Sequence, residues 1–534
     1  MVEPIKLLKL FLLISVVVVL FGCKNETERS IAKSSIFKYP LTTKITTFDP
    51  AKISDHEGAI SALLINQIYE GLVKIGVSNT PEPALAEKWD ISKDGLTYTF
   101  YLKKNVKFHT GELMTAHDVK WSFERACKYE FASPTAKETF KNIEGAIKRL
   151  EGNAKHIKGL KVLNEYTLQI KLKEPKSHFL AKLTMPVASI LPRKKTPTKA
   201  INNIEAVVGT GPFKLSEYHP SQLVVLTAHK HYHSGRPQLK KIHIPIVKDR
   251  IAALNMTKAG KLDFCGLTPL EYKNIKKEKS EKRHVFVKNS SIVAYLQLNP
   301  KAYEPFKDIK VRKAIIKAIN KDLITQQILF GLPKPATTFI PAGVPGHRKL
   351  AQNYTFNPKH SRLLLSKTKY KSGNKLPKLK ISVYDTSPNG IAATENIAMQ
   401  LKRNLGLNVT VKRLDFSTYM QKMHKNKLAM RFGGWSTSCI DPYQYLPYLF
   451  HSKSAMNSFN YSNSEFDHYC DQAEKKVDSR SKLKMYAKAE DILLQDGYIF
   501  PLFYPKDPLL ISNHVKGLQF NLFSFLPHTK VSIN

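Results

Sequence analysis

Hydrophobic and polar positions follow two spacings along the chain, and each spacing predicts a different element. The segments 96–102 and 166–172 carry an apolar or aromatic residue at every second position, which is typical of half-buried strands. Between them, Thr115 and Asp118 form a variant capping box. Apolar residues at helical spacing follow this box, so a helix is expected to begin here.

The second half of the chain shows the same mixture of spacings. A strand is expected over 292–299, and a single helix with a continuous apolar stripe over 309–328. Another helix, stopped by Gly406, precedes a strand over 407–411. The last long helices are expected from 465 to 495. Strands that alternate with helices in this way predict α/β layers.

The beginning of the chain predicts export. Two lysines precede an apolar run over 10–21, which is too short to span a bilayer comfortably. The run ends in a sequence that resembles the bacterial lipobox, whose cysteine, here Cys23, becomes lipidated. We therefore expect a signal peptide over 1–22 and a lipidated tether over 23–35, with an uncleaved signal anchor as the alternative. The mature protein would lie in the periplasm or cell envelope, anchored to a membrane by its lipid.

The charge balance is strongly basic. The chain has 84 Lys+Arg against 43 Asp+Glu, a formal net charge of +41. Such a charge favours contact with anionic surfaces. The lysines are spread along the whole chain, which favours a solvated basic surface, and export argues against nucleic acid as a partner.

Four cysteines remain after the lipobox: Cys127, Cys265, Cys439 and Cys470. An oxidising compartment would allow one or two disulfides among them, and the three ways of pairing four cysteines stay open. No pair has the C-x-x-C spacing of a redox or zinc motif.

No pattern in the chain indicates catalysis, a metal or a cofactor. His229, His231 and His233 alternate, but polarity at a strand edge is the preferred interpretation over a metal site. Nucleophile and zinc-protease motifs are absent from the sequence. The protein is therefore not expected to be an enzyme.

Several segments, in order along the chain, match one family. They are 47–50 (TFDP), 68–72 (IYEGL), 83–126, 209–213 (GTGPF), 258–263 (KAGKLD), 295–300, 311–314 (VRKA), 434–435 (GW) and 441–442 (DP). Together they resemble the peptide-binding branch of family 5 of the bacterial extracellular solute-binding proteins, the oligopeptide- and dipeptide-binding lipoproteins of ABC importers.

The resemblance implies a periplasmic-binding-protein fold of type II (cluster C), in which two α/β lobes form a clamp and a small extra domain is added. By this resemblance the second lobe covers 289–499 and the extra domain covers 78–189. The first lobe is assembled from three segments, 36–77, 190–288 and 500–534.

A clamp of this kind binds its ligand between two surfaces and needs no catalyst. By resemblance, Gly434 and Ser436 would bond the backbone of an extended peptide, and Trp435 would wall the site. The alternative for this segment is a glycine-rich turn beside a core tryptophan. A loop on the facing lobe would supply further contacts, against the alternative of a solvated turn. Its residues are Ser54, Asp55 and His56.

The peptide's ammonium group needs a carboxylate partner if it is enclosed. Peptide binders of the family place an aspartate where this chain has Ser438. Asp441 or Asp55 would then have to take over, or the ligand has no free amine. Arg431 is a candidate partner for a ligand carboxylate.

These features predict an importer's binding protein that captures oligopeptides by closing two lobes and delivers them to the ABC permease subunits. It is expected to be a monomer. Two alternatives remain. One keeps the fold and the role but takes a different ligand, such as a cell-wall peptide, a metal complex, haem or another solute. The other is a basic surface lipoprotein that binds anionic polymers.

Overall fold

The computed structural model describes residues 35–53, 58–130, 132–278, 280–349, 355–384, 387–437, 439–522 and 527–534. The expected signal peptide, Cys23 and nearly all of the tether lie outside these ranges. Within them, none of the helices has the length and hydrophobicity that crossing a membrane requires.

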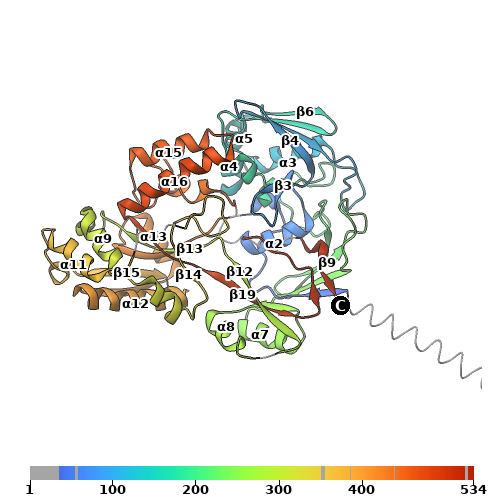
Figure 1. Ribbon diagram of the computed structural model, residues 1–534. Coiled ribbons are helices and arrows are strands. Elements are labelled where there is room, and N and C mark those ends of the chain that lie inside the picture. Colours follow the sequence, from blue (N-terminus) through green and yellow to red (C-terminus); the bar gives the residue numbers. More distant parts are fainter. Residues whose placement is uncertain are drawn as a thin grey trace, which may run out of the picture.

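The largest sheet has six strands in the order β14-β18-β13-β17-β15-β16. Its central strand β13 is buried along its whole length, so both faces of the sheet are covered. Three helices pack on one face and two on the other (Figure 1). We call this sheet and its helices lobe two. Its strands are β13 (Val293–Leu298), β14 (Lys334–Pro335), β15 (Leu379–Tyr384), β16 (Val409–Leu414), β17 (Met430–Trp435) and β18 (Ile499–Tyr504). The first face carries α9 (Ile309–Lys317), α11 (Pro358–Ser366) and α12 (Pro388–Leu405), the second α15 (Ser464–Glu474) and α16 (Ser479–Asp496).

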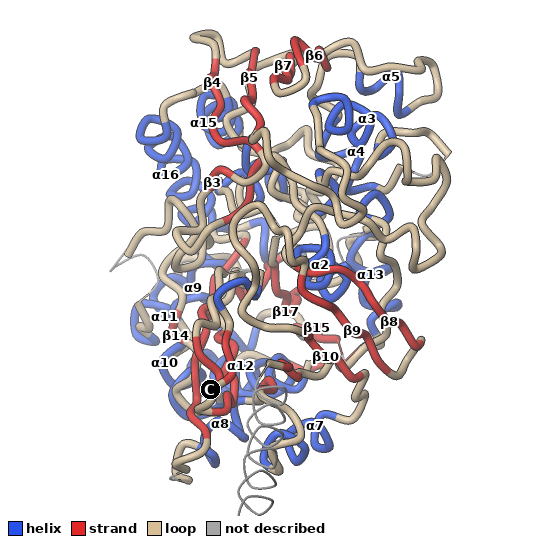
Figure 2. The backbone as a smooth tube through the Cα atoms, turned by 90° about the vertical axis from the view of Figure 1, so that its right-hand side faces the viewer, coloured by secondary structure: helices blue, strands red, loops and turns tan. Residues whose placement is uncertain are grey.

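Two smaller sheets form lobe one, in the orders β1-β10-β9-β8 and β11-β19-β12. Figure 2 shows β8, β9 and β10 at the side of the molecule away from α11 and α12. The strands are β1 (Ile36–Lys38), β8 (Phe213–His219), β9 (Leu223–Ala228), β10 (Lys241–Pro245), β11 (Phe264–Gly266), β12 (Arg283–Asn289) and β19 (Lys506–Ser512). The helices are α2 (Gly58–Ile68), α7 (Arg250–Lys258) and α8 (Pro269–Ile275).

A further four-stranded sheet, β4-β5-β7-β6, and its helices form what we call the extra domain. The expected capping box is confirmed, since the Asp118 carboxylate accepts from the Thr115 backbone N–H at 2.9 Å. The strands are β4 (Ala86–Ile91), β5 (Thr97–Leu102), β6 (Leu160–Asn164) and β7 (Thr167–Lys171), and the helices α3 (Ala116–Ala126), α4 (Pro134–Phe140), α5 (Ala146–Leu150) and α6 (Phe179–Lys182). Short pieces elsewhere are β2 (Val73–Ile75), β3 (Pro81–Pro83), β20 (Val515–Lys516), β21 (Ser532–Ile533), α10 (Lys321–Leu323), α13 (Phe416–His424) and α14 (Pro447–Phe450).

One antiparallel ribbon joins the two lobes. β12 pairs with β19 in lobe one, and β13, which follows β12, pairs with β18 in lobe two. The chain thus passes between the lobes at 290–292 and again at Pro505. Figure 1 shows β12 and β19 side by side below β13. Residues 500–504 belong to the sheet of lobe two, so the last segment of lobe one begins about five residues later than expected.

The expected single helix over 309–328 is wrong. α9 ends at Lys317, and Asn320 then starts α10, which runs into a π-helical turn at Ile324–Ile328. The Asn320 side chain accepts from the Leu323 N–H at 3.1 Å, as an N-cap does. The apolar stripe continues across the break because both pieces pack on the same sheet.

None of the disulfides that the sequence would allow among the four described cysteines is formed. All four described cysteines are free and buried; Cys127 and Cys439 share one hydrophobic core, and Cys265 and Cys470 lie in two others. Burial raises the pKa of the Cys265 thiol, so it stays protonated and behaves as a small apolar group.

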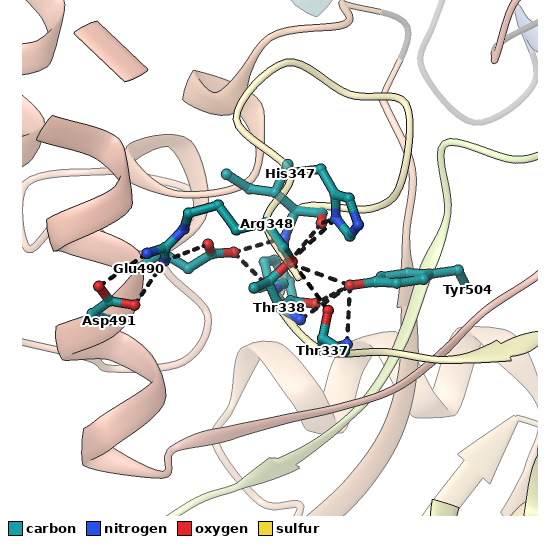
Figure 3. A network of polar contacts seen from close by, with 9 residues as sticks. Thr337, Thr338, His347, Arg348, Glu490, Asp491 and Tyr504 are labelled. Atoms are coloured by element: carbon teal, nitrogen blue, oxygen red, sulfur yellow. Dashed lines mark hydrogen bonds and ion pairs between the residues drawn. The ribbon is translucent and has the colours of Figure 1, made fainter. Parts of the chain in front are cut away.

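The loop 336–348 is held against α16 and β18 by a polar network (Figure 3). Glu490 is fully buried and accepts from two successive backbone N–H groups of the loop, both at 2.9 Å. Arg348 donates to Glu490 and to Asp491, at 2.9 and 2.7 Å. Tyr504 donates its hydroxyl to a loop carbonyl at 2.8 Å. Every partner of this buried carboxylate is therefore a hydrogen-bond donor, which its burial requires.

A buried ion pair fastens the extra domain to lobe one. Arg125 of α3 binds Asp49 through two parallel bonds of 2.9 and 2.7 Å, and both side chains are almost fully buried. Asp49 also accepts from the Ile201 N–H at 3.0 Å, and Arg125 donates to the Pro197 carbonyl at 3.0 Å. The TFDP segment therefore has a structural role in addition to its place in the sequence pattern.

We expect Asp49→Ala to lower the free energy of unfolding by about 3–5 kcal/mol, because it removes the carboxylate that neutralises the buried Arg125 guanidinium. Urea denaturation of the purified protein measures this. Arg413→Gln is the matched control, since Arg413 and Glu395 form an exposed pair that contributes little. Equal stabilities for the two variants would contradict a stabilising role of the Asp49–Arg125 ion pair.

Candidate ligand-binding site

The main cavity lies between lobe two and the other parts of the chain and has a volume of about 560 Å³. Lobe two contributes α13, the end of β17 and the loop 455–459. The opposite wall is made by Ile53, by α4 and by the segment 182–187 of the extra domain. The volume is within the range of about 300–1,000 Å³ that is usual for small-ligand sites.

β17 loses its partner on one side where it enters this cavity. β15 pairs only with Met430 and Arg431 of β17, whereas β13 pairs with all six residues of the strand. Beyond Arg431, the edge that faces β15 has no strand partner in the described part of the chain. This free edge, residues 433–436, lines the main cavity. An extended ligand can add to it through backbone hydrogen bonds.

The two glycines of this edge have different roles. A Cβ on Gly433 would lie 2.8 Å from the Tyr295 ring, so this glycine is needed for packing. A Cβ on Gly434 would meet only Ile292, at an ordinary 3.7 Å. The protein itself therefore does not require a glycine at 434, and the space in front of it is free for a ligand backbone.

Trp435 and Ser436 continue the edge. The half-buried indole donates to the Gln444 carbonyl at 2.9 Å and lies 5.9 Å from the Tyr448 ring, so it stands as a fixed wall of the cavity. Ser436 is exposed and lines the same cavity. Four residues singled out from the sequence, Arg431 and 434–436, are thus brought together here.

Arg431 is buried, with 4% of its surface exposed, and still lines the main cavity. It donates to Gln297 and to the Tyr419 hydroxyl, and it lies 5.1 Å from the Phe459 ring centroid. Burial opposes its charge, but Tyr295 and Tyr419 more than offset this and raise the pKa of Arg431. No carboxylate of the described residues forms an ion pair with it, so its charge is available to a ligand anion.

Asp441 does not occupy the position suggested for it. It is buried, caps the turn that follows it, and binds Lys482 of α16. It is not among the residues that line the main cavity. The sequence places Asp441 near Trp435 but cannot show that a lysine 41 positions later neutralises it.

The carboxylate that does line the cavity is Glu138 of α4. It binds Lys182 at 2.9 Å and Lys141 at 2.6 Å, and the Tyr443 hydroxyl lies 3.4 Å away. Burial raises the pKa of Glu138, but the two lysines outweigh burial and lower it overall. On this wall one negative and one positive side chain, Glu138 and Lys182, line the cavity, and Glu138 was not expected from the sequence.

Four of the expected site residues lie outside the described ranges: Ser54, Asp55, His56 and Ser438. Their part in the site stays a prediction.

Sequence reasoning also missed an apolar wall. Met185, Met420, Met423 and Met456, four of the ten methionines, line the main cavity together with aromatic side chains. Met420 and Met423 lie on α13 with Phe416, at the spacing of one helix face. In the sequence this stripe cannot be told from a stripe that packs into a core.

The three alternating histidines follow β9 in a turn. His229 bonds the Gly211 carbonyl at 3.2 Å, and its ring lies 4.9 Å from that of His109. His233 bonds Glu70 at 2.9 Å. His229 therefore packs against the 209–213 turn, His233 is paired with Glu70, and His231 is exposed.

The sequence model described as bacterial extracellular solute-binding proteins, family 5 Middle, matches residues 80–457. The chain belongs to this family. Its members are substrate-binding proteins that work outside the cytoplasm, as the description states.

Curated relatives cover nearly the whole chain. The dipeptide-binding protein DppE of Bacillus subtilis is 27% identical over 89% of this chain and 87% of its own length. The heme-binding protein A of Haemophilus influenzae is 28% identical over 95% and 94%. Oligopeptide-binding protein OppA of Bacillus subtilis is 24% identical over 93% and 92%.

Solved structures share the fold. The murein tripeptide-binding protein MppA of Escherichia coli superposes with a TM-score of 0.74 at 22% identity, over 94% of this chain and 98% of its own. Haemophilus influenzae OppA in complex with the peptide RPPGFSPFR gives 0.72 at 23%, over 94% and 99%. The expected periplasmic-binding-protein fold is confirmed.

The contact between the extra domain and lobe two should be sensitive to acid. His178 is buried, stacks on Tyr443 at 3.7 Å, and has no hydrogen-bond partner for either ring nitrogen among the described residues. Burial, and then Lys182 and other lysines, hold the pKa of His178 well below its usual value. The unfolded chain binds this proton below about pH 6.5 and the folded chain does not, so stability falls as the pH drops.

We expect His178→Phe to keep the stability of the wild type at pH 7.5, because the stack remains and no hydrogen bond is lost. Between pH 6.5 and 4.5 the variant should lose less stability, by up to about 1.4 kcal/mol per pH unit. Urea denaturation across this range measures the slope. His468→Phe is the control, because His468 lies exposed on a helix surface. If His178→Phe shows the same dependence of stability on pH as the wild type, His178 is not the source of the acid sensitivity.

Proposed function

We propose that the chain is the substrate-binding protein of an ABC importer and captures short peptides outside the cytoplasm. The observation that carries this is the free edge of β17, residues 433–436, which opens into the cavity between lobe two and the extra domain. A peptide can complete the sheet at this edge. Backbone bonds are indifferent to side chains, so one site accepts many sequences.

The relatives support a peptide ligand. DppE, OppA and MppA are named for dipeptides, oligopeptides and a murein tripeptide, and a Helicobacter pylori relative, described as ABC transporter-associated, was solved with the peptide STSA. Delivery to permease subunits follows from this role, and we keep the expectation of a monomer. Lipidation of Cys23 would hold the protein at a membrane beside the permease.

The ammonium group of a free peptide needs a carboxylate partner when it is enclosed. Glu138 is the carboxylate that lines the cavity within the described ranges, and two lysines already neutralise it. Asp55, Ser438 or Glu138 itself would have to receive the ammonium. The charge at the described wall favours a second candidate, the same transport role for a ligand without a free amine.

This second candidate has precedents in the family. Relatives are named for haem and for deoxycholate, and another was solved with Fe(III)-EDTA. Binding of matched peptides with free and acetylated amino termini separates the two. Loss of affinity on acetylation supports free peptides, and unchanged or higher affinity supports the amine-free ligand.

We expect Gly434→Val to lower peptide affinity about ten- to a hundredfold, because two or three backbone bonds of about 0.5–1.5 kcal/mol each become inaccessible. Its stability should stay close to that of the wild type, since a Cβ at this position meets only Ile292, at 3.7 Å. Titration calorimetry with a peptide mixture and then with single peptides measures the loss.

Gly266→Val is the matched control for this experiment. Gly266 is also an exposed strand glycine with open space for a side chain, but it lies in β11, away from the main cavity. Equal effects of the two substitutions would show that peptides do not add to β17.

We expect Arg431→Gln to weaken binding of peptides with a free carboxyl terminus by about ten- to a hundredfold, because a bond between charged groups contributes about 1.5–3 kcal/mol. The corresponding peptide amides should lose little. Their binding therefore also controls for folding of the variant. A uniform loss for acids and amides would argue against a ligand carboxylate at Arg431.

A further inference from the structure

The sheet β1-β10-β9-β8 of lobe one has an apolar side and a basic side. Its apolar side packs in the core of the lobe, with fully buried side chains that include Phe37, Leu226 and Ile242. Successive residues of a strand point to opposite sides of a sheet. Lys38, Lys214 and Lys241 each stand next to a buried residue of their strand, so they point outward. We call this outward side, together with the loop 229–240, the basic face.

The charge of this part of the chain is uneven. Over residues 206–248 six side chains are Lys or Arg, and Glu217 is the single acidic one. The whole chain, by comparison, has 84 basic and 43 acidic residues. Among the described residues no carboxylate forms an ion pair with any of the six or with Lys38. The ion pairs nearest in sequence, at His233 and Arg250, involve none of them. The positive charge of the basic face is therefore not neutralised within the protein.

The predicted tether joins the described chain at the basic face. The Ser35 carbonyl accepts from the backbone N–H groups of Lys240 and Lys241, at 2.9 and 3.3 Å. Cys23 lies twelve residues before Ser35. Twelve residues span at most about 40 Å when fully extended. A lipid on Cys23 therefore keeps the basic face within this distance of the membrane.

The loop 229–240 adds further cations at the same end of the sheet. Its two ends are held together, because the Ala228 N–H donates to the Lys240 carbonyl at 3.0 Å. Lys230 and Arg236 of this loop are exposed, and so is Lys240. Cations thus gather around the point where the tether is attached.

We propose that the basic face lies on the anionic lipid headgroups of the membrane that holds Cys23. The inference rests on the anchor predicted from the sequence and is independent of the ligand in the main cavity. Lysine and arginine side chains are attracted to an anionic membrane surface, but only within a Debye length of about 10 Å. The tether brings the basic face close to the surface, and the charges then hold it there.

This contact gives the protein a defined orientation. Lobe one rests on the membrane through β8, β9 and β10. Figure 2 shows these strands at the side of the molecule away from α11 and α12 of lobe two. Lobe two is therefore held off the membrane.

The test uses the full-length chain, purified in detergent and added to preformed vesicles. One set of vesicles is phosphatidylcholine alone, and the other contains phosphatidylglycerol as well. An amine-acetylating reagent is added from outside, and mass spectrometry follows the acetylation of each lysine. We expect Lys38, Lys230 and Lys241 to react about tenfold more slowly on the anionic vesicles, because headgroups cover them. High salt should remove the difference, since it screens the attraction. Lys359 and Lys402 are exposed on α11 and α12, and they should react equally on both vesicles.

Two variants with equal losses of charge locate the contact. The first removes four cations of the basic face: Lys230→Gln, Arg236→Gln, Lys240→Gln and Lys241→Gln. Lys38 should then react as fast on anionic vesicles as on neutral ones. The matched control removes four exposed cations of lobe two: Lys359→Gln, Lys367→Gln, Lys402→Gln and Arg403→Gln. In this control Lys38 should stay protected. Thermal unfolding shows whether both variants keep the fold.

Three results would overturn the proposal. In the first, lysines of the basic face and of α11 and α12 are slowed equally on anionic vesicles. In the second, both variants lose the protection of Lys38, so that net charge and not this face is responsible. In the third, soluble polyphosphate protects Lys38 on neutral vesicles as well as anionic lipid does. The basic face would then bind anionic polymers and not specifically a membrane.

Discussion

The separation of β15 from β17 after Arg431 is the constraint on which the site depends. Backbone N–H and C=O groups that are shielded from water need partners, so a strand edge inside a protein is normally covered. Here the edge opens into a cavity instead. The surrounding residues support this opening, since Gly433 leaves room for Tyr295 and the fixed Trp435 indole walls the end of the strand.

The site is electrostatically one-sided. Arg431 stands on one wall without an ion-pair partner among the described residues, and on the other wall Glu138 is paired with Lys182. Charges enclosed at low dielectric act strongly on what enters. The interior of the clamp therefore prefers an anionic group, and it combines this preference with an apolar wall of methionine and aromatic side chains.

Local patterns predicted what depends on local structure. The alternation over 96–102, the capping box at Thr115 and the helix end at Gly406 are found as expected, because each is decided by near neighbours. The break at Asn320 was missed, since an apolar stripe reports the buried face and not the continuity of the helix.

In the candidate site, too, the residues marked by a sequence pattern were predicted and those set by long-range contacts were not. Residues 434–436 were singled out because the family pattern marks their strand, and Arg431 as a nearby cation; all four line the main cavity. The ion pairs between distant segments were not predicted, and these pairs decide which charges remain available to a ligand. Asp441 is bound by Lys482, and Glu138 comes from a helix with no site signal in the sequence.

The ribbon of β12–β13 and β18–β19 has a mechanical consequence. Sliding one strand past the other would break residue pairs between the strands on both sides of the junction, such as Asn289 with Lys506 and Ala294 with Phe503. Bending at 290–292 and Pro505 would break none of these strand pairs, because proline has no backbone N–H to donate to a sheet hydrogen bond. A rotation of the two lobes about this junction would therefore leave the strand register unchanged.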